Sequence, residues 1–473
     1  MISTRSRLKC VGWLTLFHVL LMPERFMGQA SGGSTVVLSP GDDVNAAVTA
    51  APEGTTFLLK EGVYRMQQII VKNDDTFRGE GHVVLNGSQV LSFLPDTSGS
   101  GLWVANAAAM PYDNGTCAST TPLCGYVQDL FIDDVLQARV GNTQALVPGT
   151  WFFDMSNGKA YIPEDPTGHI VEIGMTQYAL LGRIPGLSGV TISNLTIEKY
   201  AVQAQFAAIG AENLGVNWIV DHCEVRWNHG VGINVGSGST ISNSYIHHNG
   251  QLGFQVTGAD VSIINNEISW NNYAGYATDW SGGADHFSQA TNTVLRDNYI
   301  HDNNSPAMWG DTNNIDEVIE NNVIMHNAIG IRHEKSYSVT IDNNVLKGNT
   351  DMAIYILASS DANIYNNMIE VPENAVAGIG MTNATTASGA YGPFVTANNY
   401  IHDNIIIYRG PQSFSGLVND SGGDQTQAFG NLFDYNHYIL LDGGSLHWEY
   451  FSKMDWDEYQ AAGQEPHGTC CSQ

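Results

Sequence analysis

The sequence predicts an all-β fold in which the chain winds as a parallel β-helix, and three observations support this prediction. A phrase made of an apolar residue, two variable residues and an asparagine occurs six times, at steps of 21 to 24 residues with one step of 32. The intervals hold β-branched and aromatic triplets broken by Gly and Asn, without the 3.6-residue period of a helix. Hydrophobic residues make up 43% of the chain and charged residues 14%, which excludes a disordered protein. A coil of ~22 residues accommodates three short strands and their turns.

Asparagine occupies one corner of the predicted coil in all six phrases. It tolerates the left-handed backbone conformation, and its amide can bond to the asparagine of the coil above or below. We therefore expect a structural ladder of Asn228, Asn249, Asn271, Asn303, Asn327 and Asn349.

Residues 1–30 have the features of an export signal. A basic start precedes an apolar run from Val11 to Met22, and Gly28 and Ala30 supply the small residues of a cleavage site. The apolar run is shorter than the ~20 residues of a membrane span. We expect a secreted protein, extracellular or periplasmic after cleavage, that is not inserted in a membrane.

After this leader we expect one β-helix over residues 31–440 and a tail with a short helix over residues 441–473. The strand Thr35–Leu38 opens the coils, and two aspartates precede a short amphipathic helix, Val44–Ala51, that would cap the open end of the solenoid. From about residue 92 to residue 174 the repeat is interrupted by a turn-rich region that we interpret as inserted hairpins.

The chain has six cysteines, and export would allow disulfides to form. Cys117 and Cys124 bracket a short loop that could close as a disulfide. Cys470 and Cys471 are adjacent, and adjacent cysteines rarely form a relaxed bridge, so these two could pair elsewhere, stay free or link chains. Cys223 stands in an apolar setting and is interpreted as a core residue.

The chain carries 47 acidic and 19 basic side chains, a net charge of −28. This charge weighs against unaided binding to nucleic acid or to an anionic membrane, whose phosphates require cationic partners. We expect a monomer that binds a glycan or polysaccharide.

The coil phrases, the capping stretch DDVNAAVTAAPEGTTFLLKEGVYR, the insert WFFDMSNGKAYIP, the segment GIRHEKSYSVTIDNN and the tail DWDEYQAAGQEPH resemble secreted bacterial right-handed parallel β-helix repeat proteins of the pectate-lyase-like superfamily. This resemblance implies a single-stranded right-handed parallel β-helix with an N-terminal capping helix. It implies no single activity, because the fold carries lyases, glycoside hydrolases, uronate epimerases and phage tailspikes.

Stacked coils bring equivalent positions to about 4.8 Å from one another, so the repeat register predicts which side chains meet. We align the strands on inward apolar residues, namely Ile233, Phe254, Tyr276, Met308, Ile331 and Ile354. The next residues then point outward: Asn234, Gln255, Ala277, Trp309, Arg332 and Tyr355. Two positions further lie Gly236, Thr257, Asp279, Asp311, Glu334 and Leu357, so three carboxylates are predicted to share one column.

Paired carboxyl groups of unequal pKa are what glycosidic hydrolysis requires, and Asp279, Asp311 and Glu334 are the predicted acid and base set. Trp309 and Tyr355 offer flat faces to sugar rings, Arg332 could hold a hydroxyl or carboxylate, and Gln255 and Asn234 extend the binding surface. The same three carboxylates could instead hold calcium or cap turns.

The 32-residue step places a loop beside this column. Loops on a rigid scaffold often carry sites, and this one brings Trp280, Asp285 and His286, the last a possible proton carrier. Lys335 is most simply a solvated turn residue, yet it is the lysine nearest the column and a possible base for β-elimination. His333 is interpreted as a core histidine.

The preferred hypothesis is therefore a secreted enzyme that cleaves a polysaccharide, with hydrolysis slightly favoured over lyase chemistry. For a lyase, Lys335 or His286 would abstract a proton while calcium and Arg332 neutralise the substrate acid. Two alternatives stay open: a noncatalytic carbohydrate-binding or adhesion β-helix, and a uronate C5-epimerase.

Overall fold

The computed structural model describes residues 33–211, 215–383, 387–418 and 428–471. The coils described here belong to one compact unit that begins at Ser34. The predicted leader, residues 1–30, lies outside the described residues.

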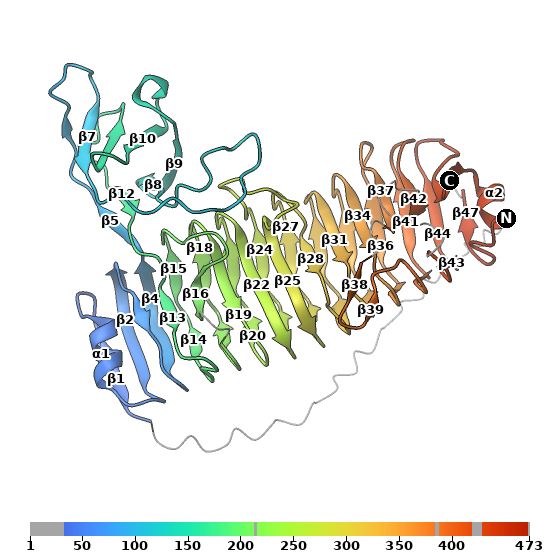
Figure 1. Ribbon diagram of the computed structural model, residues 1–473, viewed down its shortest axis with the longest axis horizontal. Helices are drawn as coiled ribbons and strands as arrows, with labels where there is room; N and C mark the ends of the chain where they lie inside the picture. The colour runs from blue at the N-terminus through green and yellow to red at the C-terminus, as the bar shows by residue number, and fades with distance from the viewer. Residues whose placement is uncertain (1–32, 212–214, 384–386, 419–427, 472–473) are drawn as a thin grey trace, which may run out of the picture. The chain divides into compact units, whose positions relative to one another are not determined.

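Residues 34–473 wind as a parallel β-helix in which most coils contribute three strands (Figure 1). One coil, for example, consists of β19 (Val231–Val235), β20 (Thr240–Ser242) and β21 (Tyr245–His247). Each strand pairs in parallel with its counterpart one coil on, as β19 does with β22 (Leu252–Ala259). The predicted all-β fold is confirmed.

One face of the coils carries longer strands than the others, and we call it the long-strand sheet. Its strands in spatial order include β13 (Leu180–Gly182), β16 (Ala207–Ala211), β19, β22, β25 (Gly283–Thr291), β28 (Met308–Asp311), β31 (Ile329–Glu334), β34 (Met352–Leu357) and β37 (Ala377–Thr382). Its inward residues build the core: Ile233, Phe254, Met308, Ile331 and Ile354 are all buried. Burial of these rows supplies the main stabilising free energy of the solenoid.

The predicted asparagine ladder is present. Asn228 Nδ2 donates to Asn249 Oδ1 over 3.0 Å, and the pattern repeats along the ladder to Asn327, which donates to Asn349 over 3.3 Å. A second ladder, which the sequence reading missed, runs through Asn266, Asn298, Asn322, Asn344, Asn367, Asn404 and Asn436. Buried amides at two corners therefore pair between coils instead of with water.

Short helices occur near both ends of the described coils. Helix α1 (Val44–Ala50) begins after Asp43, whose side chain accepts a hydrogen bond from Ala46 N at 2.8 Å, and it buries Val44 and Val48. Helix α2 (Trp456–Ala461) begins with a capping box of Asp455 and Glu458. In Figure 1 α1 lies beside the first coil, where its buried face covers the end of the apolar core.

A second sheet, formed between Ser88 and Gly174, projects from the early coils (Figure 1). Its strands are β5 (Ser88–Val90), β6 (Leu94–Pro95), β7 (Trp103–Asn106), β8 (Leu130–Ile132), β9 (Val135–Arg139), β10 (Thr150–Asp154), β11 (Lys159–Ile162) and β12 (Val171–Gly174). We call it the insert sheet. It has a core of its own that includes Trp151 and Ile173.

The structure joins Cys117 to Cys124 by a disulfide. An isolated antiparallel β-bridge between the backbones of Cys117 and Tyr276 holds this loop against the coils. It also joins Cys470 to Cys471, where we had expected no bridge between neighbours. Cys223 is a buried free thiol, as expected.

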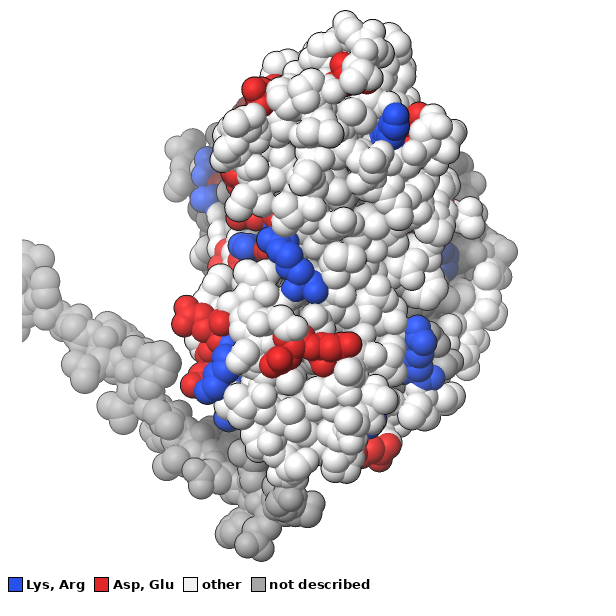
Figure 2. All heavy atoms as spheres, turned by 90° about the vertical axis from the view of Figure 1, so that its left-hand side faces the viewer, with Lys and Arg blue, Asp and Glu red and all other residues white. Residues whose placement is uncertain are grey.

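The charged side chains do not gather by sign on the face drawn in Figure 2. Acidic and basic groups lie there in small neighbouring clusters, separated by uncharged surface. Within the described residues, no helix is long and apolar enough to cross a membrane.

Candidate active site

The long-strand sheet brings two carboxylates together on adjacent coils. Asp311 ends β28 and Glu334 ends β31, and the parallel register sets them opposite each other. The same register sets Trp309 opposite Arg332, and Arg332 opposite Tyr355 on β34. These pairings agree with the register predicted from the repeat.

The predicted place of Asp279 in this column is wrong. β25 begins at Gly283, its Asp285 lies opposite Phe254, and its Ser288 lies opposite Asp311. Asp279 therefore lies in the turns before β25. The error arose because the extra residues of the long coil precede its strand, and because the inward position is filled by an aspartate where an apolar residue was assumed.

The corrected register gives one continuous line of outward residues, which we call the outer row. Asn234 lies opposite Gln255, and Gln255 lies opposite His286. The rings of His286 and Trp309 contact each other with centroids 4.8 Å apart. The outer row is thus Asn234, Gln255, His286, Trp309, Arg332 and Tyr355, with His286 in the place predicted for Ala277.

Asp311 is held in its charged form. Its Oδ2 lies 3.5 Å from His286 Nε2, and its Oδ1 accepts a hydrogen bond from Thr312 Oγ1 at 2.7 Å. Burial alone would raise the pKa of Asp311, but the contacts with His286 and Thr312 outweigh burial and lower that pKa below its ordinary value. The side chain keeps 25% of its surface exposed, so a ligand can reach the carboxylate.

Glu334 is more enclosed, with 7% of its side chain exposed, and it contacts two cations. Arg332 Nη2 lies 2.5 Å from Glu334 Oε2, and Lys335 Nζ lies 2.7 Å from Oε1. The guanidinium of Arg332 lies over the ring of Trp309, 4.7 Å from its centroid. Trp309 and Glu334 together therefore fix the position of Arg332.

The expectation that Trp309 offers an open face to a sugar is wrong. The residue is 2% exposed, and its ring contacts His286 and Arg332. Trp280 is partly buried in the turns before β25 and packs on Tyr276, with ring centroids 6.1 Å apart. Tyr355 is partly exposed and remains in the outer row beside Arg332.

The comparisons place this geometry in a known fold. A family model described as "Right handed beta helix region" matches residues 207–369. Among solved structures, XylC in complex with xylose aligns over 90% of this chain and 82% of its own, with 17% identity and a TM-score of 0.71. The chain is a right-handed parallel β-helix protein.

Other solved β-helices align less closely. The A-module of the mannuronan C-5 epimerase AlgE4 from Azotobacter vinelandii aligns over 90% of this chain and 94% of its own, with 15% identity and a TM-score of 0.53. The corresponding A-module of AlgE6 aligns over 90% and 92%, with 14% identity and a TM-score of 0.51. The search of curated proteins finds no match. The right-handed coil implied by the sequence resemblance is confirmed.

Beneath its two carboxylates the β-helix buries ionisable groups for which the sequence analysis predicted no catalytic role. Asp285 is fully buried, Trp309 N donates to its Oδ1 at 2.8 Å, and burial raises its pKa well above the ordinary value. Glu317 Oε2 lies 3.0 Å from Nδ1 of the buried His333. The placement of His333 in the core agrees with its interpretation from sequence. The sequence signal for the burial of Asp285 is its position next to His286. With the correct register His286 points outward, so Asp285 must point inward.

The proposed calcium set of Asp279, Asp311 and Glu334 is not assembled, because Asp279 lies off the column. Over the described ranges, no group of three or more His, Cys, Asp or Glu side chains is arranged to hold a metal ion. Glu334 instead has two cationic side chains beside it.

Proposed function

We propose that the chain is a carbohydrate-active enzyme that hydrolyses glycosidic bonds with retention of configuration. The observation that carries the proposal is the pairing of Asp311 with Glu334 on adjacent coils. Neighbouring parallel strands lie ~4.8 Å apart, close to the ~5 Å between the two carboxyl groups of retaining glycosidases. An inverting pair is further apart, since a water molecule must fit between substrate and base.

The environment of Asp311 suits it to the role of nucleophile, and Glu334, which contacts two cations, is left with the role of proton carrier. A nucleophile must be ionised, and the pKa of Asp311 is lowered by His286 and Thr312 despite its burial. Asp311 would attack the anomeric carbon, and the bond to the leaving oxygen would break as that oxygen takes a proton from Glu334, which receives it from the Lys335 ammonium 2.7 Å away. Glu334, now a carboxylate, would then take a proton from the water that cleaves the glycosyl ester.

The groups around the pair support this chemistry. Arg332 contacts Glu334 and lies over Trp309, so it positions the Glu334 carboxyl and adds positive charge beside it. Lys335 is 36% exposed, contacts Glu334 and can exchange protons with solvent. The likeness to XylC, whose structure holds xylose, supports a neutral sugar as ligand.

Elimination and epimerisation are a second candidate, because Lys335 and His286 each lie beside a carboxylate and two solved relatives are mannuronan epimerase modules. Both reactions need a base at a uronate. Products decide between them: elimination forms an unsaturated sugar that absorbs in the ultraviolet, epimerisation leaves chain length unchanged, and hydrolysis forms reducing ends only. Binding without any product would favour an adhesion module.

The test is turnover of a panel of aryl glycosides and polysaccharides, with and without a chelator. Asp311→Asn and Glu334→Gln should each lower kcat by roughly 1,000-fold, because each removes one of the two groups that transfer the glycosyl unit or its proton. Asp316→Asn is the matched control, since Asp316 is an exposed turn residue with a hydrogen bond to Ser338. Full activity in both site variants would overturn the assignment.

A further inference from the structure

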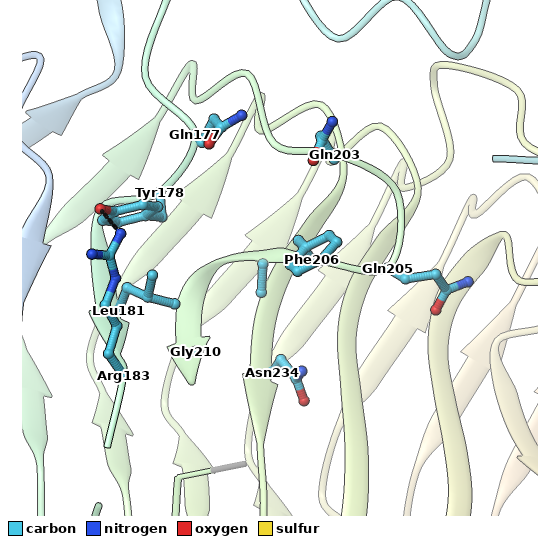
Figure 3. Close-up of a pocket in the computed structure, with 10 residues that line it drawn as sticks. Gln177, Tyr178, Leu181, Arg183, Gln203, Gln205, Phe206, Gly210 and Asn234 are labelled. Carbon is cyan, nitrogen blue, oxygen red and sulfur yellow. Dashed lines mark hydrogen bonds between the residues drawn. The ribbon is translucent and has the colours of Figure 1, made fainter. Parts of the chain in front are cut away.

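A pocket opens on the long-strand sheet several coils before the two carboxylates. Figure 3 shows it between the rings of Tyr178 and Phe206, with the amides of Gln177 and Gln203 along its rim. Its lining residues are Gln177, Tyr178, Leu181, Arg183, Gln203, Gln205, Phe206, Ala207, Gly210 and Asn234.

The pocket is continuous with the outer row that leads to the candidate active site. Leu181 on β13 lies opposite Gly210 on β16, and Asn234, the next residue of the pocket along this line, begins the outer row. Gly210 lets the neighbouring strand approach closely, because a Cβ there would lie only 3.1 Å from the backbone oxygen of Asn234. Asn234 and Asp311 are three coils apart, about 14 Å at the usual strand spacing.

Polar atoms along this path lack partners. Asn234 Oδ1, Gln255 Oε1 and Trp309 Nε1 are buried and have no hydrogen-bond partner among the described residues. Buried polar atoms are almost always satisfied in folded proteins, so three such atoms in one row call for an explanation. Asn234 and Gln255 are themselves partly exposed, so their side-chain amides border the path that a bound sugar chain would follow, while the indole N–H of Trp309 lies beneath it.

The pocket has the chemistry of a neutral sugar site. Phe206 is 58% exposed, so the face of its ring is open to a ligand in the pocket. Tyr178 is held by Arg183, whose Nη2 donates to the tyrosine Oη at 3.0 Å. Gln205 N donates to the buried Gln251 at 2.7 Å, which fixes the turn that carries Phe206. The pocket lining supplies amides, two rings and one cation, Arg183, but no carboxylate.

We propose that this pocket is a distal subsite that binds a neutral sugar unit of an oligosaccharide whose scissile bond lies at Asp311 and Glu334. The inference rests on the proposed function and extends it. The substrate is an oligosaccharide or polysaccharide chain long enough to follow the outer row from one site to the other. A disaccharide at the carboxylates is too short to reach Phe206.

The test compares short and long neutral probes in binding and turnover. Xylobiose, xylohexaose and cellohexaose are titrated by calorimetry into the wild type, Phe206→Ala, Gln177→Ala and the control Phe429→Ala, which removes an equally exposed ring that lies outside the pocket. Phe206→Ala should weaken binding of a hexaose roughly tenfold, through loss of ring contact, and leave xylobiose binding and aryl glycoside turnover unchanged. Gln177→Ala should act in the same direction, and Phe429→Ala should have no effect.

Three results would overturn the subsite: no binding of either hexaose, equal hexaose affinity in wild type and Phe206→Ala, or tighter binding of an oligogalacturonate than of both neutral hexaoses. Failure of the proposed function looks different. In that case Asp311→Asn keeps full activity, while the length-dependent loss in Phe206→Ala persists and supports the pocket as a binding site.

Discussion

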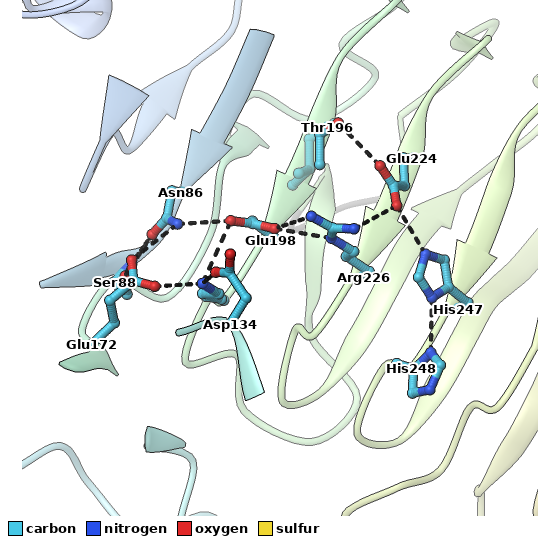
Figure 4. Close-up of polar contacts among 12 residues, drawn as sticks. Asn86, Ser88, Asp134, Glu172, Thr196, Glu198, Glu224, Arg226, His247 and His248 are labelled. Atoms are coloured by element: carbon cyan, nitrogen blue, oxygen red, sulfur yellow. Dashed lines mark hydrogen bonds and ion pairs between the residues drawn. The ribbon is translucent and has the colours of Figure 1, made fainter. Parts of the chain in front are cut away.

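Lys199 anchors the insert sheet to the coils, and replacing it with methionine should loosen that attachment. Figure 4 shows the side chains of Glu172, Glu198 and Asp134 close together where the insert sheet meets the coils. Lys199 Nζ lies 2.5 Å from Glu172 Oε2 on β12 and 3.8 Å from Glu198 Oε1, and it also contacts Asp134. The side chains of Lys199 and Glu172 are 1% and 3% exposed. Burial alone would lower the pKa of Lys199, but its carboxylate partners raise it, so the ammonium stays charged.

The stability that Lys199→Met should lose depends on the ion pairs that Glu172 and Glu198 keep after the substitution. Breaking a buried ion pair by removing one partner costs about 3–5 kcal/mol. Glu172 would keep Arg65, and Glu198 would keep Arg226 at 2.9 Å, so we expect the lower end, about 3 kcal/mol. That corresponds to roughly a 150-fold rise in the population of the locally opened insert.

Hydrogen exchange measures this opening directly. The exchange rate is followed by mass spectrometry on peptides that cover β12. Exchange there should accelerate roughly 150-fold in Lys199→Met, with little change in the later coils. Lys60→Met is the control, because its pair with Glu80 at 2.7 Å is exposed and should contribute less than about 1 kcal/mol. Equal exchange rates in Lys199→Met and Lys60→Met would refute the reasoning.

Two further predictions concern pH and the ladder. Both ring nitrogens of the buried His229 face acceptors, Asp129 Oδ2 at 2.8 Å and Cys124 O at 2.7 Å. Burial alone would lower the pKa of His229, but these two partners outweigh burial and raise that pKa. A histidine whose pKa is higher in the folded than in the unfolded protein stabilises the fold fully at pH values below its unfolded pKa of ~6.5. This stabilisation is lost as pH rises through the folded pKa. The Tm advantage of the wild type over His229→Gln, followed by calorimetry, should therefore shrink toward alkaline pH, and a constant advantage would contradict this. Asn303→Ala leaves its ladder partners Asn271 and Asn327 without their hydrogen bonds to Asn303. The free energy of unfolding, measured by urea titration, should fall by about 3 kcal/mol. A fall below about 1 kcal/mol would show that these hydrogen bonds contribute little to stability.

The repeat phrases were sufficient to predict the coil. Asn at a fixed corner and apolar residues at fixed steps recur once per coil, because equivalent residues of successive coils stack on one another. The positions of Asp311, Glu334, Arg332 and Trp309 followed from the same register, since the coils that carry them have nearly equal lengths. Register failed at the long coil, where an extra loop can be placed on either side of a strand and the inward residue, Asp285, is polar.

Other features depended on contacts between distant parts of the chain. The burial of Trp309 results from His286 and Arg332 on neighbouring coils, and no local pattern indicates it. The pocket at Phe206 joins the turns before β13 and β16, whose spacing along the chain differs from the repeat. The pairing of Lys199 with Glu172 likewise connects the insert sheet to a coil turn.

The central claim is that Asp311 is a nucleophile paired with Glu334 at the separation of a retaining glycosidase. Mass spectrometry of the enzyme treated with an activated, fluorinated glycoside tests this most directly, because such a sugar forms the glycosyl ester but slows its hydrolysis. We predict one sugar attached to the peptide that contains Asp311, and none in Asp311→Asn. Turnover with no trapped sugar, or a sugar attached to a different side chain, would contradict the account.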